Sequence, residues 1–112
     1  MKRGDVCLAH FPFTDASAAK LRPILIVSTD VFNSGDDVVV LPISSNPEAD
    51  DHHAFRIDSS SPHFKATGLR FSSAIKWTKP MTIAKCVITR RLGKLENGIM
   101  TRICQLLSQV IL

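Results

Sequence analysis

Two short runs in which every residue is aliphatic constrain this chain more than any other feature of its sequence. They span residues 24–27 (ILIV) and 38–41 (VVVL). A strand with one face in water alternates apolar and polar residues, so runs without alternation predict strands that are covered on both faces. We therefore expect both segments at the centre of a barrel, or in a sheet with a second layer behind it.

Further short segments rich in β-branched and aliphatic residues lie between turn-rich stretches. With the two runs, they predict strands at residues 5–11, 23–29, 38–43, 54–57, 73–77 and 81–89. From Asn97 onward, apolar residues recur at spacings of one, three and four, which predicts an amphipathic C-terminal helix capped by Asn97. Strands followed by one helix, without strand–helix–strand alternation, indicate a mainly β fold: a small antiparallel barrel or sandwich with a C-terminal α-helix.

Composition narrows the class of protein. The length of 112 residues is that of one domain, and we expect a single domain over residues 1–112. With 45% hydrophobic and 21% charged residues, the chain is not mainly a disordered tail, a collagen-like repeat or a coiled coil. The 14 Lys and Arg against 10 Asp and Glu give a net charge of +4, which favours anionic partners, nucleic acid first among them.

Sequence features also predict the cellular compartment. No apolar window is long enough to span a bilayer, and the charged N-terminus (MKRGD) is not followed by a signal core. The three cysteines, Cys7, Cys86 and Cys104, show no C-x-x-C spacing and stand beside aliphatic residues, which predicts buried thiols in a reducing compartment. We expect a cytoplasmic protein.

Common catalytic motifs are missing from the sequence. It contains no glycine loop for phosphates, no nucleophile elbow and no H-E-x-x-H pair. The most metal-like cluster, residues 50–53 (DDHH), is interpreted as a solvated loop, because adjacent residues of an extended chain point in opposite directions. We therefore assign no metal and no cofactor.

A series of short motifs extends along most of the chain. The segments are RGDV at 3–6, FPFT at 11–14, LRPILIV at 21–27, LPISS at 41–45, TGL at 67–69 and AIKWTKPMTI at 74–83. In this order and spacing they resemble the MazF/PemK family of toxin endoribonucleases. The resemblance implies an SH3-like barrel (PemK/MazF/CcdB-like), a homodimer and a cognate antitoxin as partner. It also implies metal-independent, sequence-specific cleavage of single-stranded mRNA to 2′,3′-cyclic phosphate and 5′-hydroxyl ends, which inhibits growth.

Cleavage of RNA through its own 2′-hydroxyl needs a proton acceptor, a proton donor for the leaving 5′-oxygen, and positive charge around the phosphorane. From the sequence alone Arg22, held by Pro23 at a loop-to-strand junction, is either a phosphate-binding guanidinium or a surface ion pair. The resemblance makes Arg22 the central catalytic residue, which stabilises charge and acts as an acid. It makes Ser44 a catalytic hydroxyl that orients the scissile phosphate, and Ser45 an RNA-binding neighbour.

Lys76 and Thr78 lie two residues apart in a predicted strand and therefore share a face, with Trp77 on the other. One branch of the family has an arginine and an aspartate at these positions, which serve proton transfer and phosphate binding. We assign Lys76 and Thr78 as catalytic positions, although Lys76 lacks the guanidinium fork and Thr78 cannot act as a carboxylate base. His10 is a candidate substitute base, since histidine titrates near neutral pH, or else a satisfied strand histidine.

Aromatic residues are the last candidates. Stacking on a splayed RNA base and core packing suit Phe13 about equally, whereas core packing is favoured for Trp77. The predicted RNA-binding residues are Phe13, Thr14, Lys20, Ser45 and His10. Two other interpretations stay open: a non-enzymatic gyrase poison resembling CcdB, and a degenerate family member that binds RNA or antitoxin without cleavage.

Overall fold

The central strand of the fold is β3 (Asp37–Ser44), which pairs with three other strands. The structure is a computed structural model that describes residues 1–11, 20–45 and 53–111. β2 (Lys20–Ile26) runs along one edge of β3, and along its other edge β6 (Met81–Ala84) is followed by β5 (Ser73–Ile75). Each of these pairings is antiparallel.

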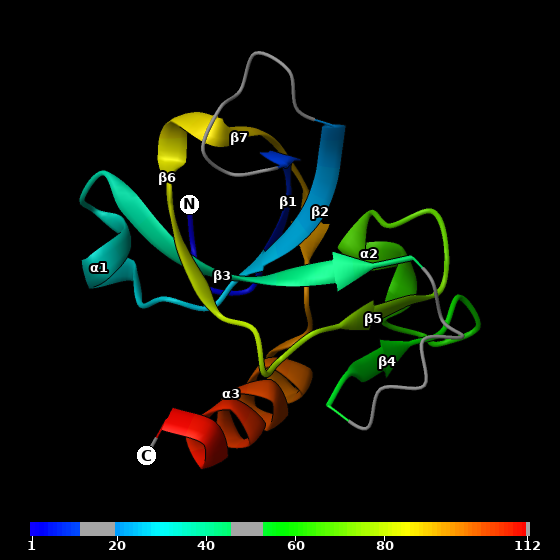
Figure 1. Cartoon of the computed structure of the whole chain (residues 1–112). Helices are drawn as coiled ribbons and strands as arrows, with labels where there is room; N and C mark the ends of the chain where they lie inside the picture. Colours follow the sequence, from blue (N-terminus) through cyan, green and yellow to red (C-terminus); the bar gives the residue numbers. More distant parts are fainter. Residues whose placement is uncertain (12–19, 46–52, 112) are drawn as a thin grey trace.

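Three more strands extend the sheet in both directions. β1 (Asp5–Phe11) pairs with β2 and with β7 (Ile88–Lys94), and β4 (Phe55–Ile57) pairs with β5. The order is β4-β5-β3-β2-β1-β7, with β6 beside β3, and the sheet curls strongly (Figure 1). Among the described residues β4, β6 and β7 each pair with one strand only, so the sheet is barrel-like but not closed.

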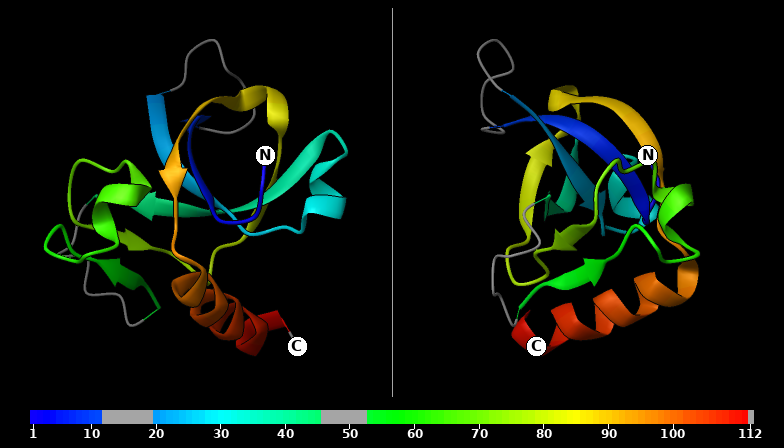
Figure 2. Two further views of the ribbon diagram at one scale, coloured as in Figure 1. Left: turned by 180° about the vertical axis from the view of Figure 1, so that it is seen from behind. Right: turned by 90° about the vertical axis from the view of Figure 1, so that its right-hand side faces the viewer.

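One long helix covers an end of this sheet. α3 (Asn97–Ile111) lies across it in every view (Figures 1 and 2), whereas α1 (Asp30–Asn33), α2 (Phe64–Thr67) and the 3₁₀ turn η1 (Lys85–Val87) are short. The predicted mainly β fold with a C-terminal helix is confirmed. In the described part of the chain, no helix combines the length and the apolar character that crossing a membrane requires.

The two aliphatic runs are covered on both faces, as their sequence predicts. On one face Ile24 and Val40 are fully buried in a cluster that β6 closes with Ile83. On the other face Leu41 is fully buried in a second cluster, to which α3 contributes Ile103. Strands that lie between two apolar layers have no water-facing side, and this is why the runs do not alternate.

Strand β2 differs from the predicted strand at residues 23–29. It covers Lys20–Ile26, so Arg22 lies inside the strand and not at a loop-to-strand junction. Arg22 pairs opposite Ala9 of β1 and is exposed, in contrast to the buried residues that follow Pro23. The first residues of β2 form backbone pairs without covering the core, so no apolar pattern marks them in the sequence.

The predicted strand at residues 81–89 is also wrong as a single element. It divides into β6 and β7, with η1 between them. The N–H of Lys85 donates to the carbonyl oxygen of Asp36 over 2.9 Å, at the point where the chain leaves β3 and turns to pair with β1. A single straight strand cannot pair with both β3 and β1.

The predicted strand at residues 73–77 ends early, at Ile75. The N–H of Trp77 donates back to the Ile75 carbonyl oxygen over 3.0 Å, and the turn places the indole in the core, where it is 8% exposed. Core packing of Trp77 is therefore confirmed. Lys76 and Thr78 lie in this turn and do not share a face of a strand.

The structure corrects three smaller predictions. Glu96, not Asn97, caps α3, because its carboxylate oxygens accept the N–H groups of Gly98 and Ile99 at 2.9 and 3.0 Å, which lowers the pKa of Glu96. The cysteines are free thiols, but Cys86 is exposed and not buried as expected. The turn-rich stretch between the predicted strands at 54–57 and 73–77 contains the short helix α2.

Candidate functional site

Arg22 and Ser44 come from neighbouring strands and line one pocket. Ile24 of β2 pairs with Pro42 of β3, and two residues further along each strand are Arg22 and Ser44. Residues two apart on a strand share a face, so both side chains lie on the same side of the sheet. The pocket has a volume of about 230 Å³, and Phe11 and Pro42 also line it. We call it the Arg22 pocket.

Lys76 lies on the far side of β3 from Arg22. Its N–H donates to the carbonyl oxygen of Pro42 over 3.0 Å, which continues the pairing of β5 with β3 by one residue. Arg22 and Lys76 therefore flank the end of β3 that carries Ser44. Thr78 is half-buried in the turn that follows, which the Lys79 N–H closes on the Lys76 carbonyl at 3.1 Å.

The predicted RNA-binding residues are spread over more than one surface. His10 pairs opposite Leu21, so it lies on the face of the sheet opposite to Ala9 and Arg22. Its Nδ1 is buried and has no hydrogen-bond partner among the described residues. Lys20 is exposed at the start of β2. Phe13 and Thr14 lie outside the described residues. The structure thus brings Arg22, Ser44 and Lys76 together and separates His10 from them.

A second cavity of about 390 Å³ begins on the other side of Arg22. It also contains Ser45, and its lining includes Arg70, Phe71 and Arg90, which the sequence did not single out. No acidic residue is among its described lining residues. We call it the arginine cleft. The adjacent pair Arg90-Arg91 in the sequence could have indicated this cleft. Adjacent residues of a strand point to opposite faces, so one of the two arginines has to lie on the face of the sheet that carries the cleft.

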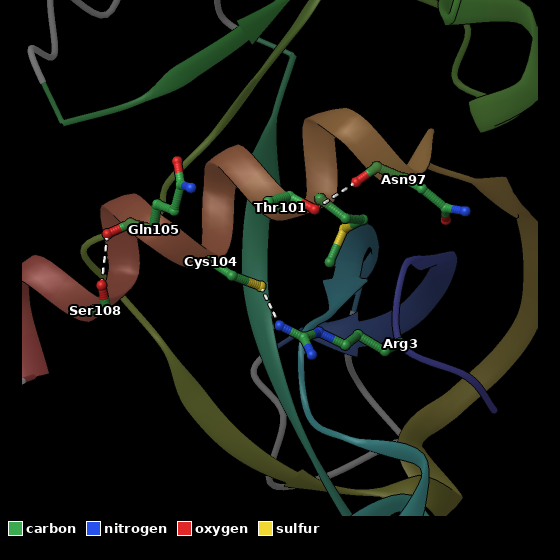
Figure 3. A pocket seen from close by; sticks show the side chains of 7 residues that line it. Arg3, Asn97, Thr101, Cys104, Gln105 and Ser108 are labelled. Atoms are coloured by element: carbon green, nitrogen blue, oxygen red, sulfur yellow. Dashed lines mark hydrogen bonds between the residues drawn. The ribbon is translucent and has the colours of Figure 1, made fainter.

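Other arginines differ because they have partners within the chain. The Arg91 Nε donates to Asp5 over 3.0 Å, and Arg56 pairs with Asp58 at 3.4 Å. Figure 3 shows the guanidinium of Arg3 directed at Cys104 of α3, with its Nη2 2.6 Å from the sulfur. This contact lies in a larger cavity, of about 470 Å³, that holds none of the predicted site residues.

The Arg22 pocket offers a guanidinium, a hydroxyl and, across β3, an ammonium group. Among the described residues, no three His, Cys, Asp or Glu side chains gather in a geometry that could hold a metal ion. A guanidinium can meet a phosphate with two parallel hydrogen bonds, and a lysine adds a point charge. A curled β sheet with a capping helix and these cationic cavities defines a small β protein suited to an anionic ligand.

Comparison with known proteins agrees with this class. The family model of the PemK-like, MazF-like toxin of type II toxin–antitoxin systems matches residues 2–111. A protein of Mycolicibacterium smegmatis named "Probable endoribonuclease MazF" is 30% identical over 102 residues, which cover 91% of this chain and 88% of the relative. The chain therefore belongs to the PemK/MazF toxin family, and it is a homologue of a protein named as an endoribonuclease.

Solved structures share the fold at lower identity. The MazE–MazF complex of Deinococcus radiodurans matches with a TM-score of 0.76 and 12% identity, over 99% of this chain and 94% of that one. An endoribonuclease in complex with its cognate antitoxin, from a mycobacterial species, matches with a TM-score of 0.74 and 19% identity, over 99% and 94%. These likenesses confirm the predicted barrel-like architecture.

Proposed function

We propose that this chain is, as a single domain over residues 1–112, the toxin of a toxin–antitoxin pair that cleaves single-stranded mRNA at specific sequences and thereby inhibits growth. The observation that carries the proposal is the pocket shared by Arg22 and Ser44 at the end of a basic β sheet, in a chain of the PemK/MazF family. Cleavage proceeds without a metal ion and leaves a 2′,3′-cyclic phosphate and a 5′-hydroxyl.

The reaction uses the RNA's own 2′-hydroxyl as nucleophile. The 2′-oxygen loses its proton and bonds to phosphorus, the bond from phosphorus to the 5′-oxygen breaks, and the leaving oxygen gains a proton. Arg22 stabilises the charge of the phosphorane and donates toward the leaving oxygen, while Ser44 orients the phosphate. Lys76 adds positive charge from the other side of β3. Thr78 cannot accept the 2′-proton, so the proton acceptor is a group other than a carboxylate at this position.

The basic surface around Arg22 and Lys76, which binds the RNA, also receives the antitoxin. The solved relatives include an endoribonuclease bound to its cognate antitoxin, which supports such a partner here. An acidic, partly disordered peptide binds the same basic side chains as RNA and inhibits cleavage by excluding the RNA.

The toxin acts as a homodimer in the cytoplasm, where mRNA is available. Light scattering at micromolar concentration should give twice the mass of the chain.

Cleavage of a defined RNA in the presence of EDTA tests the function. The purified protein should produce fragments with 5′-hydroxyl ends, which accept a labelled phosphate from a kinase without prior phosphatase treatment. Binding of RNA without any cleavage would instead favour the degenerate member. Growth arrest with intact mRNA would favour the gyrase poison.

A further inference from the structure

The arginine cleft adjoins the Arg22 pocket, because Arg22 lines both cavities. Arg22, Arg70 and Arg90 carry the positive charge of the cleft, and among the described residues none of the three forms an ion pair. The contrast with Arg91, whose guanidinium is neutralised by Asp5, is sharp because Arg91 follows Arg90 directly. Positive charges that remain uncompensated around a cavity favour an anionic ligand.

An exposed aromatic ring shares this cleft with the arginines. Phe71 is 67% exposed, and Leu21, which also lines the cleft, is 49% exposed. Folding does not account for leaving such a ring in water beside cationic side chains. Proteins that hold single-stranded nucleic acid combine these two features: cations along the backbone and an aromatic face on which a base stacks.

The wall that carries Arg70 and Phe71 is fixed by a close approach of two backbones. Gly68 ends α2 with φ +72°, and a Cβ at this position would lie 2.2 Å from the carbonyl oxygen of Leu92 in β7. Gly93 faces it from β7, where a Cβ would lie 2.1 Å from the carbonyl oxygen of Ala66. Only glycine permits this contact, so the cleft is formed before any ligand arrives.

We propose that the arginine cleft is a nucleotide subsite, in which a base next to the scissile phosphate stacks on Phe71 while Arg70 and Arg90 hold the flanking phosphates. The inference rests on the proposed RNA cleavage at Arg22. Arg22 lines both cavities, and Ser45, which follows Ser44 of the Arg22 pocket, lines the cleft, so an RNA strand held at Arg22 continues into the cleft. The cleft therefore selects the base at one position beside the cut.

Phe71→Ala tests the stacking contact. Wild type and variant are incubated with a randomised RNA pool, and the 5′-hydroxyl ends are sequenced to obtain the base preference at each position. Phe71→Ala should flatten the preference at one position beside the cut and lower kcat/KM on the preferred oligonucleotide about tenfold. The matched control is Phe32→Ala, an exposed phenylalanine on α1 that should change neither.

Arg90→Gln tests the phosphate contact through salt. Each phosphate contact to a single strand contributes about 0.7 to the slope of log affinity against log salt concentration, so the variant's slope should be shallower by about that amount. Arg102→Gln, an exposed arginine on α3, is the matched control and should keep the wild-type slope. A slope that stays unchanged in Arg90→Gln would overturn the role of this residue.

Two oligonucleotides, each abasic at one of the two positions beside the cut, separate this proposal from the proposed function. The one that lacks the base stacked on Phe71 keeps the scissile phosphate but has nothing to stack, so wild type and Phe71→Ala should cleave it at the same rate. If wild type cleaves no RNA at all, the proposed function fails. If it cleaves and Phe71→Ala keeps the same preference and rate on long substrates, only the subsite is wrong.

Two further outcomes would overturn the subsite in favour of another occupant. If Phe71→Ala cleaves normally but is no longer inhibited by a synthetic acidic, leucine-containing peptide that inhibits wild type, the cleft receives the antitoxin and not RNA. If light scattering shows that Phe71→Ala changes the oligomeric state while Phe32→Ala does not, the ring belongs to a contact between copies of the chain.

Discussion

The two ends of the paired strands β1, β2 and β3 differ in what their polar side chains contact. At the end where β1 begins, Asp5 is 8% exposed and accepts hydrogen bonds from Arg91 Nε and the Lys2 N–H at 3.0 and 2.9 Å. We call this the closed end. At the other, open end, Arg22 is exposed and has no ion-pair partner among the described residues.

The closed end satisfies its buried polar groups within the chain. Asn33 is 3% exposed, donates from Nδ2 to the Ser28 carbonyl at 3.0 Å, and its Oδ1 accepts a hydrogen bond from the Ser28 hydroxyl. The hydroxyl oxygen of Ser28 also accepts a hydrogen bond from the Val39 N–H at 2.9 Å. Groups that are paired inside the chain stabilise the fold. The arginines at the open end contribute little to stability and remain available for a ligand, so substitutions at the two ends should affect different quantities.

Substitution at the open end should give the largest effect. Arg22→Ala removes a donor that stabilises the charge of the transition state, so we expect cleavage to fall by about 10² to 10³ or more, and toxicity in cells to be lost. The free energy of unfolding should change by less than about 0.5 kcal/mol, because Arg22 is exposed. Single-turnover kinetics and urea unfolding measure the two effects. Arg102→Ala on α3 is the control, and near wild-type cleavage by Arg22→Ala would show that the assigned active site is wrong.

The closed end should show the reverse behaviour. Asp5→Ala removes a largely buried acceptor of two hydrogen bonds, and we expect the free energy of unfolding to fall by about 1–3 kcal/mol. Asp58→Ala is the matched control, because its pair with Arg56 is exposed and should contribute less than about 1 kcal/mol. Cleavage per folded molecule should not change in either variant. A loss of cleavage in fully folded Asp5→Ala would mean that the two ends are coupled.

Lys76→Ala should have a smaller effect at the open end. Lys76 flanks β3 opposite Arg22 and supplies a point charge without a bidentate fork, so we expect rate and RNA affinity to fall about tenfold or less. Lys79→Ala, an exposed lysine of the same turn, should leave both unchanged. Equal losses in the two variants would mean that Lys76 acts only through the net charge of the surface.

Much of the fold could be predicted from hydrophobic pattern, and the errors have identifiable causes. The aliphatic runs and the helical spacing after Asn97 locate the buried strands and α3. The exposed residues that start β2 at Lys20 pair through their backbone and leave no hydrophobic pattern, so the predicted start of this strand is wrong. The turn that buries Trp77 leaves no periodic pattern either, so the predicted end of β5 is wrong. The Glu96 cap was missed because asparagine is the commoner capping residue and stands one position later.

The candidate site was less accessible to sequence reasoning than the fold. Arg22, Ser44 and Lys76 were selected through the family resemblance, and the structure places them around the end of β3, but their catalytic roles stay predictions. Arg70, Phe71 and Arg90 were not selected, because the arginine cleft depends on the pairing of Leu8 with Arg90 and on the close approach of the backbone at Gly68 to Leu92 and of that at Gly93 to Ala66. Neither can be read from local patterns.

The smallest predicted effect concerns the thiol of Cys7, beside Asp5 at the closed end. Burial, and secondarily the charge of Asp5, raise the pKa of Cys7 from 9.0 to about 11. In the unfolded chain the thiol ionises near pH 9, whereas in the folded chain it keeps its proton until about pH 11. The unfolded state therefore releases its proton first, and the free energy of unfolding should fall as the pH rises from 9 to 11, with no contribution below pH 9.

Urea unfolding of wild type and Cys7→Ala at pH 7, 9 and 10.5 measures this contribution. Cys7→Ala loses some packing at every pH, but its stability should fall less steeply above pH 9 than that of wild type. Every other ionisable side chain is common to the two proteins, so the difference between their slopes isolates the Cys7 thiol. Cys86→Ala, which removes an exposed thiol, should follow the wild-type slope. If the free energies of unfolding of Cys7→Ala and wild type fall in parallel as the pH rises, folding does not raise the pKa of Cys7. The contrast between the two ends then rests on Asp5 and Asn33 alone.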